Sequence, residues 1–178
     1  MRELASTPSS AVAVPAVLRS LVLLAATVSA GLGAGAFALY AHTVMPGLGA
    51  TDDRTFVAAF QALDRAILNP WFLGGSFVGT LVLGGAAGVL GLGRPELPWI
   101  AAAVALHLVV VVITFAVHLP LNDALKAAGP TADPAVVRAA FDEARWRSAN
   151  LARTAASLLA FVLLAWALVV QARASGGR

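Results

Sequence analysis

Residues 97–119 read LPWIAAAVALHLVVVVITFAVHL, and this stretch decides the fold. It contains no Asp or Glu, and it is long enough to cross a bilayer, which takes about 20 mainly apolar residues in a helix. Three further apolar runs without an acid in the middle occupy residues 17–41, 71–92 and 150–170. Only helices and closed barrels satisfy their backbone in lipid, and the short alternating strands of a barrel are absent. The sequence therefore predicts an all-α protein built as a four-helix transmembrane bundle.

The overall composition agrees with this prediction. Of the 178 residues, 60% are hydrophobic and 12% are charged, whereas soluble domains are about 25% charged. This excludes most soluble enzymes, nucleic-acid binders and disordered proteins. The net charge of +3 comes from 12 Lys and Arg against 9 Asp and Glu, without a basic cluster, so we expect no nucleic-acid partner. The chain has no Cys, which excludes disulfides, thiolate catalysis and Cys-ligated metal sites.

We divide the chain into a flexible tail (residues 1–15), a single membrane domain (16–172) and a short C-terminal tail (173–178). Residues 1–30 also fit a cleavable signal peptide, because two arginines precede an apolar segment that ends in Val28-Ser29-Ala30. The apolar run continues through residues 31–41, which favours a retained membrane span.

The connections between spans are unequal. The link at 93–98 is short, whereas residues 42–70 and 120–149 form long loops that share one side of the membrane. In the first long loop, Phe56, Phe60, Leu63 and Ile67 recur at helical spacing, which predicts an amphipathic loop helix that lies on the membrane or caps the bundle. Pro120 is expected to end the third span. We place the chain in a bacterial cytoplasmic membrane with both termini cytoplasmic, because basic residues on that side lie close to helix ends with few acids beside them.

Each span carries one mildly polar face, richest at the end of the long loops. The side chains concerned are His42, Asn69, His118, Asn122, Trp146, Asn150 and Arg153. Their convergence would form a polar pocket roofed by the loop helix. The alternative is structural, because polar side chains commonly bond across membrane helices, and Arg and Trp anchor helices at the interface.

Two of these residues are the strongest candidates for function. Arg153 lies about one turn inside an apolar run, where ionisable groups are usually functional, and Asp64 or Asp123 could neutralise it. His118 precedes Pro120 and has polar neighbours, which makes it a plausible proton acceptor. For His107, in the middle of its span, a neutral ring bonded to a Thr or a carbonyl is the simpler interpretation.

Two motifs carry a family resemblance. His118-Leu-Pro120-Leu-Asn122-Asp-Ala-Leu125 resembles the Pro-x-Asn-x-x-Leu element of the DUF1772 family, and Trp146-Arg-Ser-Ala-Asn150-Leu-Ala-Arg153 resembles its Trp-x-x-x-Asn-x-x-Arg element. The loop helix that ends in Asn69-Pro70 also fits, and the resemblance covers about residues 17–170. This family of small four-helix integral membrane proteins includes anthrone oxygenases, which convert the activated methylene of a polyketide anthrone to a ketone without a metal or flavin.

The resemblance implies an oxidoreductase that takes a hydrophobic aromatic substrate and no cofactor. Such a site needs a base, donors for an oxyanion and an apolar slot for flat rings. His118 or His42 could be the base, and Arg153, Asn150 and Asn122 could stabilise the oxyanion. The candidates for contact with the substrate are Trp146, Phe115, Asn69 and His107.

Two other classes of function fit the same residues. One is a haem or metal binder that uses His42, His107 or His118. His107 and His118 lie about 16 Å apart along one helix, so these two cannot ligate one iron together. The other class is a non-enzymatic membrane protein that binds a lipid, a quinone or a partner protein. In that case Asn122, Asn150 and Arg153 would tie the long loop to the last span.

Overall fold

The computed structural model describes residues 15–129 and 131–176, which form helices and no strands. The N-terminal tail predicted for 1–15 therefore lies almost wholly outside the described residues, as do residues 177–178. Four continuous helical segments are long and apolar enough to cross a membrane. They run over Ala16–Gly49, Trp71–Leu90, Leu97–Ala127 and Glu143–Gly176. The predicted fold class is confirmed, and the chain is an integral membrane protein.

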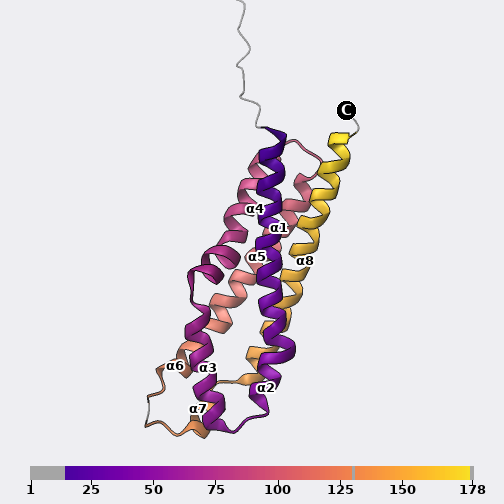
Figure 1. Cartoon of the computed structure of the whole chain (residues 1–178). Coiled ribbons are helices and arrows are strands. Elements are labelled where there is room, and N and C mark those ends of the chain that lie inside the picture. The colour runs from indigo at the N-terminus through magenta and orange to yellow at the C-terminus, as the bar shows by residue number, and fades with distance from the viewer. Residues whose placement is uncertain (1–14, 130, 177–178) are drawn as a thin grey trace, which may run out of the picture.

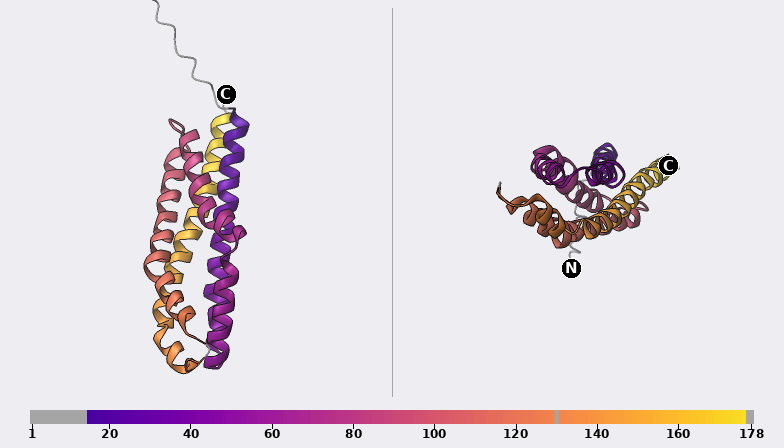
Figure 2. Two further views of the ribbon diagram at one scale, coloured as in Figure 1. Left: turned by 90° about the vertical axis from the view of Figure 1, so that its left-hand side faces the viewer. Right: turned by 90° about the horizontal axis from the view of Figure 1, so that it is seen from below.

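The four spans form a bundle in which α1 (Ala16–Leu39) and α5 (Leu97–Ile113) each pack against both α4 (Val78–Leu90) and α8 (Glu143–Gly176). The start of α1 and the end of α8 lie at one end, and the long connections lie at the other (Figures 1 and 2). The membrane core is made of small and branched side chains, among them Ala26, Ala30, Ile100, Ala103, Ala160 and Leu164. Small residues let helix backbones approach closely, which is how membrane helices gain packing contacts.

A second, aromatic core fills the end of the bundle that carries the long connections. It joins α2 (Met45–Gly49), α3 (Asp53–Ile67), α6 (Leu119–Ala127), α7 (Pro134–Ala140) and the start of α8. Its buried side chains are Met45, Phe56, Phe60, Leu125, Phe141 and Trp146. The 34 residues of α8 measure about 51 Å, against about 30 Å for the hydrocarbon layer, so part of α8 extends beyond the lipid.

Helix α3 is the predicted amphipathic loop helix. Asp52 caps it by accepting a hydrogen bond from the Thr55 N–H at 3.0 Å, and a further bond from the Thr55 hydroxyl lowers the pKa of Asp52 below its usual value. Phe56 and Phe60 are buried on its inner face. The helix stands along the bundle axis and packs against α6 and α7, so it extends the bundle upright and forms one wall of it (Figure 1).

Three spans change from α- to π-helical geometry at the same level of the bundle. The π-helical segments are η1 (Tyr40–Val44), η2 (Trp71–Phe77) and η3 (Thr114–His118). The prediction that Pro120 ends the third span is wrong, because the wider turn of η3 comes directly before it and the helix continues as α6 to Ala127. A proline ring clashes with the carbonyl one α-turn earlier, and a π-turn relieves that crowding. Helices α7 and α8 are separated at Asp142, whose φ is 51°.

Candidate functional site

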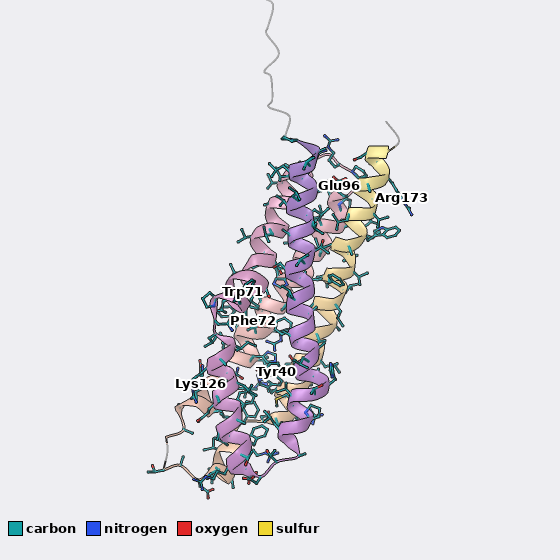
Figure 3. The ribbon with its side chains drawn as sticks, in the orientation of Figure 1. Tyr40, Trp71, Phe72, Glu96, Lys126 and Arg173 are labelled. Atoms are coloured by element: carbon teal, nitrogen blue, oxygen red, sulfur yellow. The ribbon has the colours of Figure 1, made fainter. Side chains whose placement is uncertain are left out.

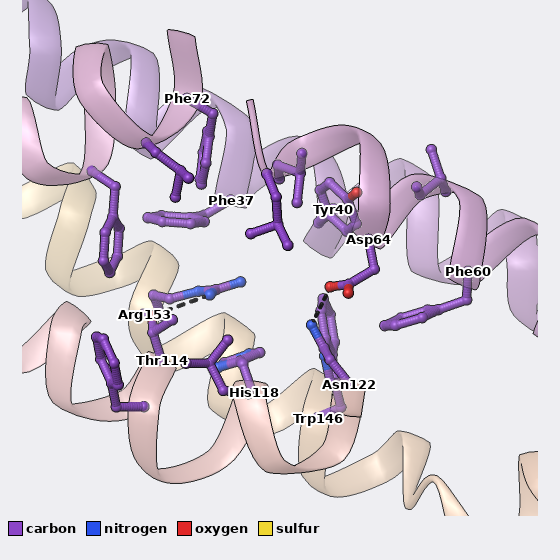
Figure 4. A pocket seen from close by; sticks show the side chains of 17 residues that line it. Phe37, Tyr40, Phe60, Asp64, Phe72, Thr114, His118, Asn122, Trp146 and Arg153 are labelled. Carbon is purple, nitrogen blue, oxygen red and sulfur yellow. Dashed lines mark hydrogen bonds between the residues drawn. The ribbon is translucent and has the colours of Figure 1, made fainter. Parts of the chain in front are cut away.

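A cavity of about 220 Å³ lies where the membrane core meets the aromatic core. Four walls surround it: α1 with η1, α3 with η2, η3 with α6, and α8. Figure 4 shows the cavity from close by, and Figure 3 places Tyr40, Phe72 and Lys126 in this half of the molecule. Its aromatic lining comprises Phe37, Tyr40, Phe60, Phe72, Phe77, Phe115 and Trp146. All three π-helical segments contribute to it, and π-turns inside α-helices frequently occur at functional sites.

Arg153 supplies a positive charge to the cavity. Its side chain is held by Asn150 Oδ1, 2.7 Å from Nη2, and by Thr114 Oγ1, 3.3 Å from Nη1, and the guanidinium lies over the Phe37 ring at 4.1 Å. The residue is 8% exposed, and its buried Nε has no hydrogen-bond partner. Within the described part of the chain no carboxylate forms an ion pair with it.

The predicted counter-ions of Arg153 are wrong. Asp64 Oδ2 and Asp123 Oδ1 both pair with Lys126 Nζ, at 3.0 and 2.9 Å. Lys126 lies one helical turn beyond Asn122 on α6, outside the lining of the cavity. A buried guanidinium without a carboxylate is costly unless a ligand or a π-face compensates it. The Phe37 face offsets part of this cost, and Nε has no hydrogen-bond partner, so Arg153 can still bind an anionic or electron-rich ligand.

His118 lines the same cavity and is 2% exposed. Its ring stands edge-on to Trp146, with centroids 4.9 Å apart, and Nδ1 lies 3.4 Å from the Ile113 carbonyl oxygen. With the proton on Nδ1 facing that carbonyl, the lone pair of a neutral ring resides on Nε2. Nε2 is buried and has no hydrogen-bond partner. The cavity lining thus includes a histidine whose Nε2 makes no hydrogen bond and an arginine that pairs with no carboxylate of the described residues.

Asn122 and Asn150 each use both the oxygen and the nitrogen of the side-chain amide in bonds to the protein. Asn122 accepts a bond from Trp146 Nε1 at 2.9 Å and donates to Asp64 Oδ1 at 2.6 Å, which connects α6, α8 and α3. Asn150 donates to the Phe37 carbonyl at 3.1 Å while it holds Arg153. Both amides therefore position other groups around the cavity.

The remaining predicted site residues are distributed unevenly. Phe115 lines the cavity and is 61% exposed. Asn69 is exposed and lies two residues before η2, where its Oδ1 accepts a bond from the Phe72 N–H. His107 Nε2 donates to the Phe77 carbonyl at 2.9 Å, the carbonyl-bonded arrangement expected for it. His42 is exposed and bonds Thr43 at 2.6 Å. The structure brings His118, Asn122, Trp146, Phe115 and Arg153 to one cavity, with Asn150 behind Arg153, but not His42, Asn69 or His107.

Several lining residues were not predicted. Phe37, Tyr40, Phe72 and Phe77 are apolar or amphipathic residues in apolar runs, where nothing marks them as special. The one available signal is proline: Pro46 and Pro120 follow η1 and η3, and Pro70 precedes η2. The prolines beside three apolar runs could therefore have predicted at which depth along the bundle the site lies.

The sequence profile of the anthrone oxygenase family matches residues 69–163, more than half of the chain. The chain belongs to the anthrone oxygenase family. This is the DUF1772 family that the two motifs indicated, and that prediction is confirmed. The matched segment of this anthrone oxygenase family member includes His118, Asn122, Trp146, Asn150 and Arg153, and leaves out the walls formed by α1 and α3. No curated protein and no solved structure matches the chain.

The three histidines lie in different surroundings. Over residues 15–129 and 131–176, no three His, Cys, Asp or Glu side chains gather closely enough to hold a metal ion. Of the three, His118 alone lines the cavity. A haem or metal centre held by two histidines would need its second histidine from outside this lining.

Proposed function

We propose that this member of the anthrone oxygenase family is an oxygenase that acts without a metal or flavin on a flat, anthrone-like aromatic substrate bound in the cavity. The observation that carries the proposal is that one aromatic cavity is lined both by His118, whose Nε2 makes no hydrogen bond, and by Arg153, which pairs with no carboxylate of the described residues. A base and an oxyanion donor are the two groups that the reaction needs.

His118 is the proposed base. Its neutral ring would take a proton from the activated methylene through Nε2, while Nδ1 stays on the Ile113 carbonyl. The second candidate base, His42, is exposed and bonds to Thr43, so it would first have to turn inward.

Arg153 is the proposed stabiliser of the anion. Deprotonation places negative charge on the substrate's carbonyl oxygen, and a preorganised cation that water cannot reach stabilises such charge strongly. Thr114 and Asn150 use one N–H each of Nη1 and Nη2, so Nε–H and the second N–H of each terminal nitrogen have no hydrogen-bond partner and remain for this role. Asn150 and Asn122 then act as positioning residues for Arg153 and Trp146.

The electron-rich anion reduces O₂ directly, and the balance closes without a cofactor. The methylene carbon loses its two hydrogens and gains one oxygen atom as a ketone. The other oxygen atom leaves as water after the C–O bond forms and the O–O bond breaks. The aromatic walls from Phe37, Phe72 and Phe77 would hold the rings flat, since offset and edge-on contacts suit aromatic pairs.

Turnover by variants tests the proposal. The purified chain in lipid nanodiscs is given anthrone, and anthraquinone formation is measured above the rate in empty nanodiscs. We expect turnover to be lost in His118→Ala and Arg153→Ala and retained in His42→Ala. Unchanged turnover in both site variants would refute the assignment. Binding of anthraquinone without turnover by the parent chain would instead favour the non-enzymatic alternative, a membrane protein that binds a quinone or lipid.

A further inference from the structure

The second and third spans separate at the level of the cavity. Helices α4 and α5 pack together in the part nearer the termini, and His107 still contacts the Phe77 carbonyl. Beyond that contact, η2 and η3 form opposite walls of the cavity (Figure 4). The cavity therefore has a side that faces between two spans.

Exposed apolar side chains border this side. Leu68, Leu73 and Phe115 line the cavity and are at the same time exposed, Phe115 to 61% and Leu68 to 50%. Leu73 and Phe115 lie on spans and, as exposed apolar side chains of a membrane protein, face lipid tails, whereas Leu68 precedes the second span. Of the polar lining residues, Asp64, His118 and Arg153 are buried, and Tyr40, Thr114 and Asn122 are partly buried.

The depth of this opening follows from helix rise. The segment Trp71–Leu90 measures about 30 Å, which equals the hydrocarbon thickness, so Leu73 lies about 3 Å from one edge. Phe115 comes about 27 Å along its own span from Leu97, near the same edge. Trp71, 82% exposed, occupies the depth at which Trp anchors helices to the membrane interface.

We propose that the gap between η2 and η3 is a lateral entrance through which the ligand reaches the cavity from the lipid interface. The ligand class that fits it is an uncharged, planar, amphipathic aromatic, which concentrates at this depth with its polar edge toward water. Such a molecule slides between Leu73 and Phe115 and reaches His118 and Arg153 without crossing the bulk water. The inference rests on the proposed function for the identity of the ligand, but not for the existence of the entrance.

The absence of Cys from the chain gives a clean way to block the entrance. Phe115→Cys is alkylated with a bulky maleimide, and Val112→Cys, one turn away and exposed to lipid, is the matched control. In both, Trp71, Trp99 and Trp166 are replaced by Phe, so that fluorescence reports only Trp146 at the cavity wall. The protein in vesicles is mixed with vesicles that contain 2-hydroxyanthraquinone, and the quenching of Trp146 is followed in time.

We expect alkylation at position 115 to abolish the fast, saturable phase of quenching, and alkylation at position 112 to leave it intact. The same rate of Trp146 quenching in both alkylated proteins would refute the proposed entrance. A second probe tests the entrance independently of the proposed function. Brominated phospholipid in the bilayer quenches Trp146 through the opening, whatever the substrate of the protein is. If the parent chain shows no saturable quenching by 2-hydroxyanthraquinone, the proposed ligand class is wrong. The entrance is then upheld if brominated lipid quenches Trp146 less after alkylation at 115, and refuted if that quenching is unchanged.

Discussion

Arg153→Met separates a ligand-binding role of the guanidinium from a structural one. Methionine keeps much of the side-chain volume and removes the charge. The native side chain gains two hydrogen bonds and a cation–π contact, together about 4 kcal/mol. Burial of a guanidinium without a carboxylate costs several kcal/mol in return. Because the two contributions nearly cancel, we expect the melting temperature to change by about 4 °C or less.

Ligand affinity should respond much more strongly. A hydrogen bond to a charged group contributes about 1.5–3 kcal/mol, so loss of Arg153 should weaken binding of a phenolate about 10- to 100-fold. The assay is titration of Trp146 fluorescence with 2-hydroxyanthraquinone at mildly alkaline pH, where the phenol is ionised. Arg147→Met, on the same helix at an exposed position, is the matched control and should leave affinity unchanged. Unchanged affinity in Arg153→Met, or a large loss of stability with affinity preserved, would refute the reasoning.

Three further predictions concern the elements that build the site. Asn122→Ala breaks the link between α3 and α8 and leaves the buried Trp146 N–H unpaired. We therefore expect the free energy of unfolding to fall by about 1–3 kcal/mol and amide hydrogens in α3 to exchange faster. In Gly79→Ala the new methyl group would meet the Gly74 carbonyl oxygen, which should lower the free energy of unfolding by about 1–3 kcal/mol. In the control Gly85→Ala the methyl group meets nothing within 4 Å. Equal melting temperatures of the two variants would contradict this prediction. Asp52→Ala should lower the melting temperature at neutral pH, because the ionised carboxylate caps α3. The difference in melting temperature between the variant and the parent chain should shrink as pH falls through the lowered pKa of Asp52. A difference that does not depend on pH would contradict the capping role.

The sequence was sufficient for the bundle and for its loop helix. Apolar runs of spanning length leave few alternatives in lipid, and the spacing of Phe56 and Phe60 placed their side chains on one buried face. Arg153 and His118 could be singled out because an ionisable side chain in an apolar run is rare and costly.

The remaining features depended on geometry that the α-helical period does not describe. Extrapolation at 3.6 residues per turn predicted that His42 shares the site, but η1 follows a wider turn and His42 is exposed while Tyr40 lines the cavity. The partner of Asp64 was also beyond prediction. Lys126 reaches it because the third span continues past Pro120, and a sequence reading that stops the helix there cannot place them together.

The most direct test of the central claim is the fate of oxygen atoms in a single reaction. The chain in nanodiscs is supplied with anthrone and ¹⁸O₂, without added metal or flavin, and the anthraquinone is analysed by mass spectrometry together with O₂ consumption. A cofactor-independent oxygenase predicts one ¹⁸O atom in each product molecule and one O₂ consumed per product, at a rate above empty nanodiscs that falls to their level in His118→Ala. Product formation no faster than in empty nanodiscs, or a rate unchanged by His118→Ala, would contradict the account.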